Sequence, residues 1–238
     1  MGMSDQPRTP DDLFLKRLDA LYCTDPNGRL VCTNEWDWRP APRFHLMRTA
    51  QGPIFRCRTD VPEEVVSRLG ELCRTEPLDR AFEKQPVHRD RYLEILAEHA
   101  AVEKLWSGPS YRAVRDPFPA ATATLVTPEN AALLQDGFED WLPDIPHRQP
   151  FLAVVKEGRA VSICASVRIT AAVHCAGVET HADHRRSGHA AQAVAAWARA
   201  VRSLGAAPFY STSWDNIASQ GVARRLDMEL AGVDFHVT

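Results

Sequence analysis

The chain has 238 residues, 45% of them hydrophobic and 25% charged, with a formal net charge of −3 at pH 7. This balance argues against a broad surface for nucleic acid or anionic membrane, because such surfaces need an excess of basic charge. No apolar run approaches the roughly 20 residues that cross a bilayer, and residues 1–12 are too polar for a signal sequence. We therefore expect a cytoplasmic protein without membrane or nucleic-acid partners.

Two hairpins are predicted near the amino terminus. The first turns at Asp25-Pro26-Asn27-Gly28 and the second at Gln51-Gly52-Pro53. Proline presets one backbone dihedral of such a turn and glycine accepts a positive one. The flanking apolar segments are the predicted strands, at residues 21–23, 29–32, 44–47 and 54–57.

The rest of the first half is predicted to be helical and then to end in a linker. Asp60, with Glu63 three residues later, is typical of a helix start. A second helix is expected at residues 89–99. From Trp106 to Pro119 the segment is rich in proline and glycine, which indicates a linker. We therefore predict an α+β domain over residues 1–119 and a second domain over residues 120–238.

Six cysteines are scattered along the chain without a Cys-x-x-Cys pair. They are interpreted as small buried hydrophobic residues. Cys23 and Cys32 flank the first hairpin, so the hairpin would bring them near one another. In a reducing compartment the thiol is the default form, and no structural disulfide is expected.

The second half begins with a helix capped by Thr127, with Pro128 in its first position. Two strands, 151–155 and 161–169, are joined by the tight turn Glu157-Gly158-Arg159. A third strand is predicted at residues 173–180. A helix with apolar residues on one face follows at residues 190–204, and Gly205 ends it.

Between that third strand and the helix lies the turn Arg185-Arg186-Ser187-Gly188-His189-Ala190. The first backbone N–H groups of a helix have no intrahelical partner, and the helix dipole makes this end positive. Gly188 and Ala190 leave the backbone accessible, while the two arginines add charge and paired donors. The turn therefore predicts a binding site for phosphate.

The spacing Arg-x-x-Gly-x-Ala at residues 185–190 resembles the acetyl-CoA-binding motif of the GNAT acyltransferase superfamily. A strand at 208–213 and a helix opened at Trp214 resemble the next elements of that family. Asn216 and Ser219 occupy the positions that face the cofactor arm there. A closing strand at 230–237 completes an order of elements that covers about half of the chain.

This resemblance implies an α/β (α+β) fold: a mixed, mostly antiparallel sheet flanked by helices. The amino-terminal α+β domain precedes this fold. That domain could itself be a degenerate copy of the same fold. The implied cofactor is acetyl-CoA, and the implied partner is a small-molecule or peptide amine. The residues that the resemblance assigns to cofactor binding are Thr180, His181, Arg185, Arg186, Ser187, Gly188, His189, Ala190, Asn216 and Ser219.

Direct transfer of an acetyl group to a protonated amine requires a base. Glu179 is the first candidate, because it lies on the strand that the resemblance brings to the thioester. The alternative is a solvated carboxylate at a strand end, and three histidines are further candidates for the base: His174, His181 and His236. Many relatives carry a proton-donating tyrosine where this chain has Ala223, so Tyr210 or a water would replace it.

The same residues allow two other interpretations, a metal site and a protein without catalytic activity. His181, His184 and His189 follow no recognised spacing of metal ligands, so no metal is expected. The missing tyrosine favours a second hypothesis, in which the protein is a non-catalytic acyl-CoA-binding sensor or assembly module. The sequence is compatible with a monomer or with a homodimer.

Overall fold

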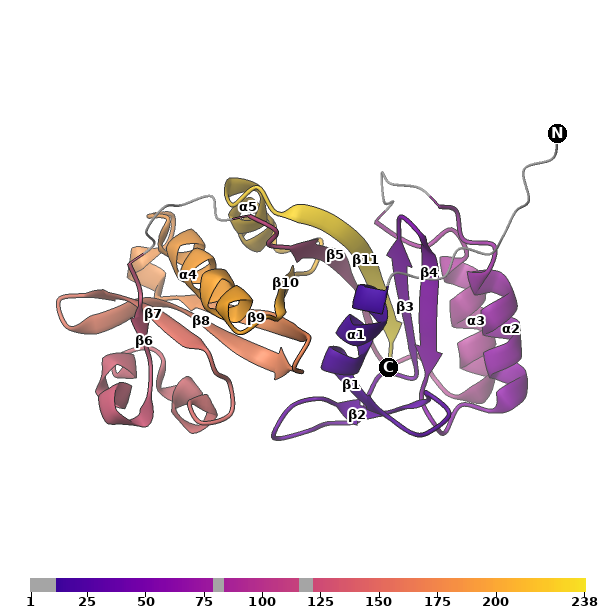
Figure 1. Cartoon of the computed structure of the whole chain (residues 1–238). Helices are drawn as coiled ribbons and strands as arrows, with labels where there is room; N and C mark the ends of the chain where they lie inside the picture. The colour runs from indigo at the N-terminus through magenta and orange to yellow at the C-terminus, as the bar shows by residue number, and fades with distance from the viewer. Residues whose placement is uncertain (1–11, 79–83, 116–121) are drawn as a thin grey trace.

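The computed structural model describes residues 12–78, 84–115 and 122–238. Its centre is a nine-stranded sheet (Figure 1). In spatial order the strands are β4 (Gly52–Cys57), β3 (Phe44–Thr49), β11 (Glu229–Val237), β5 (Leu105–Arg112), β10 (Ala207–Ser211), β9 (Val173–Thr180), β8 (Arg159–Ile169), β7 (Phe151–Lys156) and β6 (Thr124–Leu125). Only β9 and β10 are parallel neighbours. The expected mixed, mostly antiparallel sheet flanked by helices is confirmed.

Helices cover both faces of this sheet. On β10, Tyr210 packs with α4 (His189–Ser203) and α5 (Ile217–Arg225), while the preceding Phe209 packs with α1 (Asp12–Leu21). Successive side chains of a strand point to opposite faces, so α1 lies on the face opposite α4. Farther along the sheet, α2 (Glu63–Cys73) and α3 (Arg89–His99) pack on β3 and β11.

Both predicted hairpins are confirmed. The first is a separate two-stranded sheet of β1 (Tyr22–Thr24) and β2 (Leu30–Thr33), and the second is the antiparallel pair of β3 and β4. The strands predicted in the second half are also present, as β7 to β11. The helix α1, which precedes the first hairpin, was not predicted.

The linker predicted from Trp106 to Pro119 is wrong over residues 106–112, because β5 is a central strand of the sheet; its last part, residues 116–119, lies outside the described residues. It pairs with β10 on one side and with β11 on the other. Gly108 is needed there: a Cβ at this position would lie 1.9 Å from the Thr212 carbonyl oxygen. The glycine that indicated a turn therefore allows β5 to come close to the chain just after β10.

The two halves of the sequence share this sheet. β5 comes from the first half and lies between two strands of the second, while β11 from the second half pairs with β3 from the first. Figure 1 shows β11, in yellow, curving from α5 toward the amino-terminal strands. The domain boundary predicted between residues 119 and 120 falls within residues 116–121, outside the described residues, and stays a prediction.

Two helix starts differ from expectation. Asp60 does not cap α2, whose N-cap is Pro62; its carboxylate binds Arg58 through two contacts of 2.8 Å instead. The helix expected after Thr127 consists of two short 3₁₀-helices, η1 (Pro128–Leu134) and η2 (Glu139–Asp144). Thr127 and Asn130 form the capping box of η1. Among the described residues, no helix is long and apolar enough to cross a membrane.

Candidate anion-binding active site

The parallel strands β9 and β10 separate at their carboxyl ends. They pair from Val173 to Cys175 on β9 and from Ala207 to Phe209 on β10. Beyond that point β9 continues to Thr180 alongside β8, whereas β10 stays paired with β5 through Ser211. Among the described residues, the inner edges of the two strands thus have no strand partner beyond that point.

The register of β8 and β9 determines which main-chain groups face this opening. The His181 N–H donates to the Val161 carbonyl at 3.0 Å. Because hydrogen-bonded and non-hydrogen-bonded residues alternate along an antiparallel strand, Glu179 also directs its main-chain groups toward β8. The peptide groups of Val178 and Thr180 therefore face the opening. The Thr180 carbonyl accepts a 3.4 Å hydrogen bond from the Arg185 Nε.

The turn after β9 presents backbone donors on the adjoining side. Gly188 is the N-cap of α4 in the left-handed region, with φ 83°, and Arg186 is left-handed as well, with φ 62°. The Gln192 N–H is the first to donate within the helix, to the Gly188 carbonyl. The N–H groups of the first turn of α4 are left without intrahelical partners. Such a turn binds anions through its backbone.

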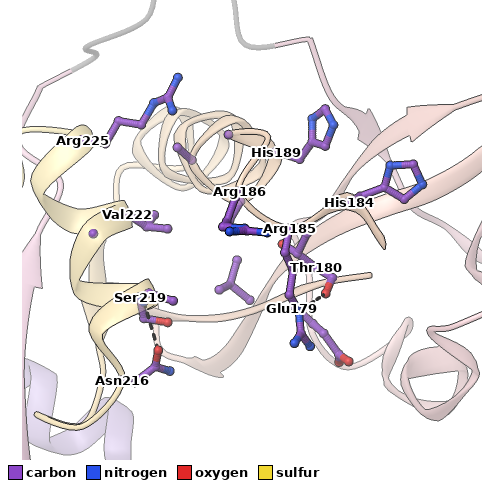
Figure 2. A pocket seen from close by; sticks show the side chains of 16 residues that line it. Glu179, Thr180, His184, Arg185, Arg186, His189, Asn216, Ser219, Val222 and Arg225 are labelled. Atoms are coloured by element: carbon purple, nitrogen blue, oxygen red, sulfur yellow. Dashed lines mark hydrogen bonds between the residues drawn. The ribbon is translucent and has the colours of Figure 1, made fainter. Parts of the chain in front are cut away.

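A pocket of about 630 Å³ joins these features to α5. Figure 2 shows its side chains: Ser219, Val222 and Arg225 on α5, and Asn216 just before that helix, lie across from the end of β9 and the start of α4. The pocket brings together most of the predicted site residues, namely Glu179, Thr180, Arg185, Arg186, Gly188, His189, Ala190, Asn216 and Ser219. Asn216 also caps α5, because its Oδ1 accepts from the Ser219 N–H at 3.0 Å.

Arg225 is a pocket residue that the sequence analysis missed. A Cβ on Gly188 would lie 3.1–3.3 Å from the Arg225 guanidinium, so this side chain covers the turn. Positions 216, 219, 222 and 225 recur every three residues, and this helical spacing is the signal that could have identified it.

The pocket is strongly positive. Arg185, Arg186 and Arg225 line it, and Glu179 is the only acidic lining residue in the described part of the chain. None of the three guanidiniums has an ion pair with a described carboxylate. Three unpaired cations beside a helix N-terminus favour a ligand with more than one negative charge.

Three predicted residues do not line the pocket. The His181 ring lies against Gly137, where a Cβ would be 2.6 Å from its Cδ2, and its Nδ1 accepts from the Asp183 N–H at 3.4 Å. Ser187 turns back toward the Arg185 carbonyl, with 3.5 Å between Oγ and O. The structure therefore does not place the His181 or Ser187 side chain among the residues that line the pocket.

The third is Tyr210, which lies behind the pocket wall. Its side chain is only 2% exposed, and its hydroxyl has no hydrogen-bond partner of good geometry among the described residues. Burial raises the pKa of this phenol to about 12, and the nearby Ser219 side chain offsets part of that rise. Ser219 lines the pocket, whereas Tyr210 does not.

Glu179 extends to the pocket edge as an exposed carboxylate. One oxygen accepts a 2.7 Å hydrogen bond from the indole Nε1 of Trp141, on η2. The main-chain carbonyl of the same residue accepts from the Ser162 hydroxyl at 3.1 Å. These two contacts fix both the side chain and the main chain of Glu179. The second carboxylate oxygen remains available to accept a proton.

The further candidates for the base lie outside the pocket. His174 is buried beside Ser166, whose Oγ is 2.8 Å from its Nδ1, and burial lowers its pKa. Burial also lowers the pKa of His236, to about 4. Among the described residues, no group of three or more histidine, cysteine or acidic side chains has the geometry of a metal site.

Comparison with known proteins gives structural similarity only. No family model matches the sequence, and no curated protein matches it. A GNAT-family acetyltransferase from Colwellia psychrerythraea is 11% identical, with a TM-score of 0.48 over 90% of this chain and 84% of that one. A GCN5-related N-acetyltransferase from Sphaerobacter thermophilus is 14% identical, with a TM-score of 0.48 over 90% and 78%.

A GNAT-family structure from Novosphingobium aromaticivorans is 16% identical, with a TM-score of 0.45. The similarity covers 57% of this chain and 65% of that chain, just under two thirds of its length. The fold is identified from the chain's own elements: antiparallel β7, β8 and β9, the glycine turn, α4, a parallel β10 that separates from β9, α5 and β11. This is the order of elements that was expected from the resemblance of the sequence to the GNAT superfamily.

Proposed function

We propose that the protein is an acetyl-CoA-dependent N-acetyltransferase that moves an acetyl group directly to an amine. The observation that carries this proposal is the positive pocket where β9 and β10 separate. It combines free helix-start amides with three guanidiniums that have no carboxylate partner among the described residues. The phosphates of CoA match this donor set in charge and in hydrogen-bonding chemistry.

The residues present fit such a cofactor. The amides of the α4 start, with Arg185, Arg186 and Arg225, would hold its phosphates. The Val178 and Thr180 peptide groups would bind its amide-containing arm as a neighbouring strand would. Bound acetyl-CoA supplies a thioester whose carbonyl carbon accepts a nucleophilic amine.

The chain's own contribution is to position the reactants and to accept a proton. Most of the rate acceleration would come from holding the thioester and the amine next to one another in the same pocket. Glu179 is the proposed base, since its carboxylate is held by Trp141 at the pocket edge and keeps one oxygen free. An amine acceptor of a lysine type has a free pKa of about 10.4, so it arrives protonated and must lose a proton.

A second candidate is a CoA-binding sensor without transfer activity. The observation that favours it is that Tyr210 is buried and does not line the pocket. Ala223, where many relatives have the proton-donating tyrosine, is fully buried as well. If no side chain donates a proton to the leaving thiolate, transfer depends on a water or on departure of the unprotonated thiolate, and it is slower.

Titration calorimetry with acetyl-CoA and CoA, followed by thiol release across a panel of amines, separates the two candidates. Binding together with thiol release that depends on an amine is expected for the transferase. Binding without release from any amine would favour the sensor. Failure of both ligands to bind would contradict both candidates.

Two glycines provide a matched pair of variants for this experiment. Gly188→Glu is expected to abolish binding, because it puts bulk and negative charge at the phosphate turn. Gly205→Glu is the control: Gly205 is also left-handed, with φ 80°, and it follows the opposite end of α4. Both variants carry the same backbone strain of about 1–2 kcal/mol. Equal affinity in the two variants would contradict the proposed phosphate site.

A further inference from the structure

Cys23 and Cys32 face each other across the β1–β2 hairpin. They are direct register partners in this antiparallel pair. The Asn34 N–H donates to the Leu21 carbonyl at 3.0 Å, so by alternation Cys23 and Cys32 also form a hydrogen-bonded pair. The Cα atoms of such a pair are about 5.5 Å apart, which is within the range of disulfides.

The two thiols differ in access to solvent. Cys23 is exposed, whereas Cys32 is 7% exposed. Burial raises the pKa of the Cys32 thiol, and the adjacent Cys23 thiol raises it further. The remaining four cysteines are all buried, including the neighbouring Cys57 and Cys73, so they offer a small oxidant no exposed thiol.

We propose that Cys23 and Cys32 form a reversible disulfide by exchange with a small-molecule disulfide such as glutathione disulfide. The Cys23 thiolate attacks one sulfur of glutathione disulfide, the S–S bond breaks, and one glutathione thiolate leaves. The Cys32 thiolate then attacks the Cys23 sulfur of the mixed disulfide and releases the second glutathione. Two electrons pass from the protein to the glutathione disulfide, and the two cysteine protons end on the two glutathione thiols.

The strand geometry makes this bond reversible. In a hydrogen-bonded pair the Cβ atoms lie up to about 5.5 Å apart, whereas a disulfide needs about 3.8 Å. The two strands must therefore approach each other, and the irregular register between Cys23 and Thr24 provides a place for this adjustment. A bond that needs such a movement is more easily reduced than a relaxed one.

The hairpin also connects to the second half of the fold. Just after β2, the Asn34 side chain donates to the Ile169 carbonyl at 3.1 Å. Glu35 forms ion pairs with Arg168 on β8 and with Arg148. A Cys23–Cys32 bond would therefore fix β2, the strand that directly precedes these contacts, and we expect slower amide hydrogen exchange at residues 22–33 in the oxidised protein.

The test uses the full chain, reduced and then incubated with glutathione disulfide and glutathione in varied ratios. Trypsin cleaves after Arg17, Arg29 and Arg43, so oxidation should join the peptide of residues 18–29 to that of residues 30–43. We expect this linked peptide in most of the protein when glutathione disulfide is in excess. We also expect the intact mass to fall by two hydrogens, and excess reduced glutathione to reverse both changes.

Variants distinguish the pair from other thiols. Cys32→Ser should lose the linked peptide and retain glutathione on Cys23, while Cys73→Ser should form the link as the unchanged protein does. Two outcomes would overturn the proposal. One is stable glutathione on Cys23 of the unchanged protein with no linked peptide at any ratio, and the other is the absence of any reaction at Cys23 and Cys32.

Discussion

Glu179 and Trp141 come from elements far apart in the sequence, and the hydrogen bond between them fixes the carboxylate at the pocket edge. At the scale of single residues, the proposed site depends on a few such contacts. In the proposed site the α4 turn would bind through its backbone and tolerate many side chains, whereas Glu179 and Tyr210 could act only through their own functional groups. The proposed roles of Glu179 and Tyr210 can therefore be tested separately, by one substitution each.

Glu179→Gln is expected to lower turnover about 10²–10⁴-fold, because the amide cannot accept the proton of the amine. Affinity for acetyl-CoA should change little, since the glutamine oxygen can still accept the bond from Trp141. Steady-state kinetics and calorimetry measure the two effects. Asp183→Asn is the matched control, because Asp183 is exposed and does not line the pocket. Unchanged turnover across the pH range would exclude Glu179 as the base.

Tyr210→Phe is expected to leave the protein as stable or to stabilise it by about 1–2 kcal/mol near neutral pH, because it removes a buried hydroxyl without a well-formed hydrogen bond. The phenol is protonated in the folded state up to a pKa of about 12, whereas an unfolded tyrosine ionises near 10.

The stability that Tyr210 contributes is therefore complete below about pH 10 and is lost as the pH rises toward 12, by roughly 2–3 kcal/mol. Thermal unfolding against pH measures this loss, which should be smaller in Tyr210→Phe. The kinetics of the same variant test its catalytic role. A fall in turnover without a fall in stability would support Tyr210 as a proton donor, and normal turnover would exclude it.

At the scale of secondary-structure elements, β5 explains why the proline and glycine content of residues 106–109 was misleading. Proline and glycine usually interrupt a strand. Here Pro109 pairs with Val233, and its carbonyl accepts from the Thr212 N–H at 3.2 Å. Gly108 allows the chain after β10 to come close. At the point where β10 separates from β9, the end of β10 is therefore still paired with β5.

Gly108→Ala is expected to destabilise the fold by about 3 kcal/mol or more, since the new Cβ would lie 1.9 Å from the Thr212 carbonyl oxygen. Gly221→Ala on α5 is the matched control. There the nearest atom is an Arg224 nitrogen at 3.9 Å, and alanine should stabilise the helix by up to about 1 kcal/mol. Chemical unfolding measures both. Equal stability of the two variants would contradict the close approach of β5 to Thr212.

At the scale of the whole molecule, a buried ion pair joins the first and last described elements. Arg17 on α1 donates to both oxygens of Asp234 on β11, at 2.9 and 2.5 Å. The same guanidinium donates to the Ser211 hydroxyl at the end of β10, at 2.9 Å. Burial alone would raise the pKa of Asp234, but Arg17 and His45 hold it below its usual value.

Arg17→Leu is expected to destabilise the protein by about 3–5 kcal/mol, because it leaves the buried Asp234 carboxylate without its main partner. Replacing Asp234 as well, with leucine, should restore most of the loss. Lys16→Leu is the control, since its partner Asp12 is on the surface. An Arg17→Leu variant as stable as Lys16→Leu would contradict the importance of the pair.

The pH dependence of the same variant has a defined sign. In the unchanged protein the Asp234 pKa is depressed, so its contribution is present above the unfolded pKa of about 4 and is lost as the pH falls below it. In Arg17→Leu the unpaired carboxylate favours protonation, so acidification from about pH 7 to about pH 4 should reduce the difference between the two proteins. Unfolding in urea at several pH values measures this.

The sequence by itself determined the elements whose signals are local. Turn residues located the hairpins, apolar periodicity located α4, and Gly188 with its flanking arginines located the left-handed turn at the start of α4. These signals suffice because a helix start or a tight turn is made by residues within a few positions of one another. Most of the predicted pocket residues follow from that turn and from the capping residue of α5.

Only the tertiary structure decided the features that depend on distant residues. These are the insertion of β5 between β10 and β11, the approach of Arg225 to Gly188, the position of Trp141 beside Glu179, and the burial of Tyr210. Strand pairing and side-chain burial are set by packing between segments far apart in the chain. A local pattern carries little information about them, because the same residues suit a linker, a surface or a core strand until their neighbours are fixed.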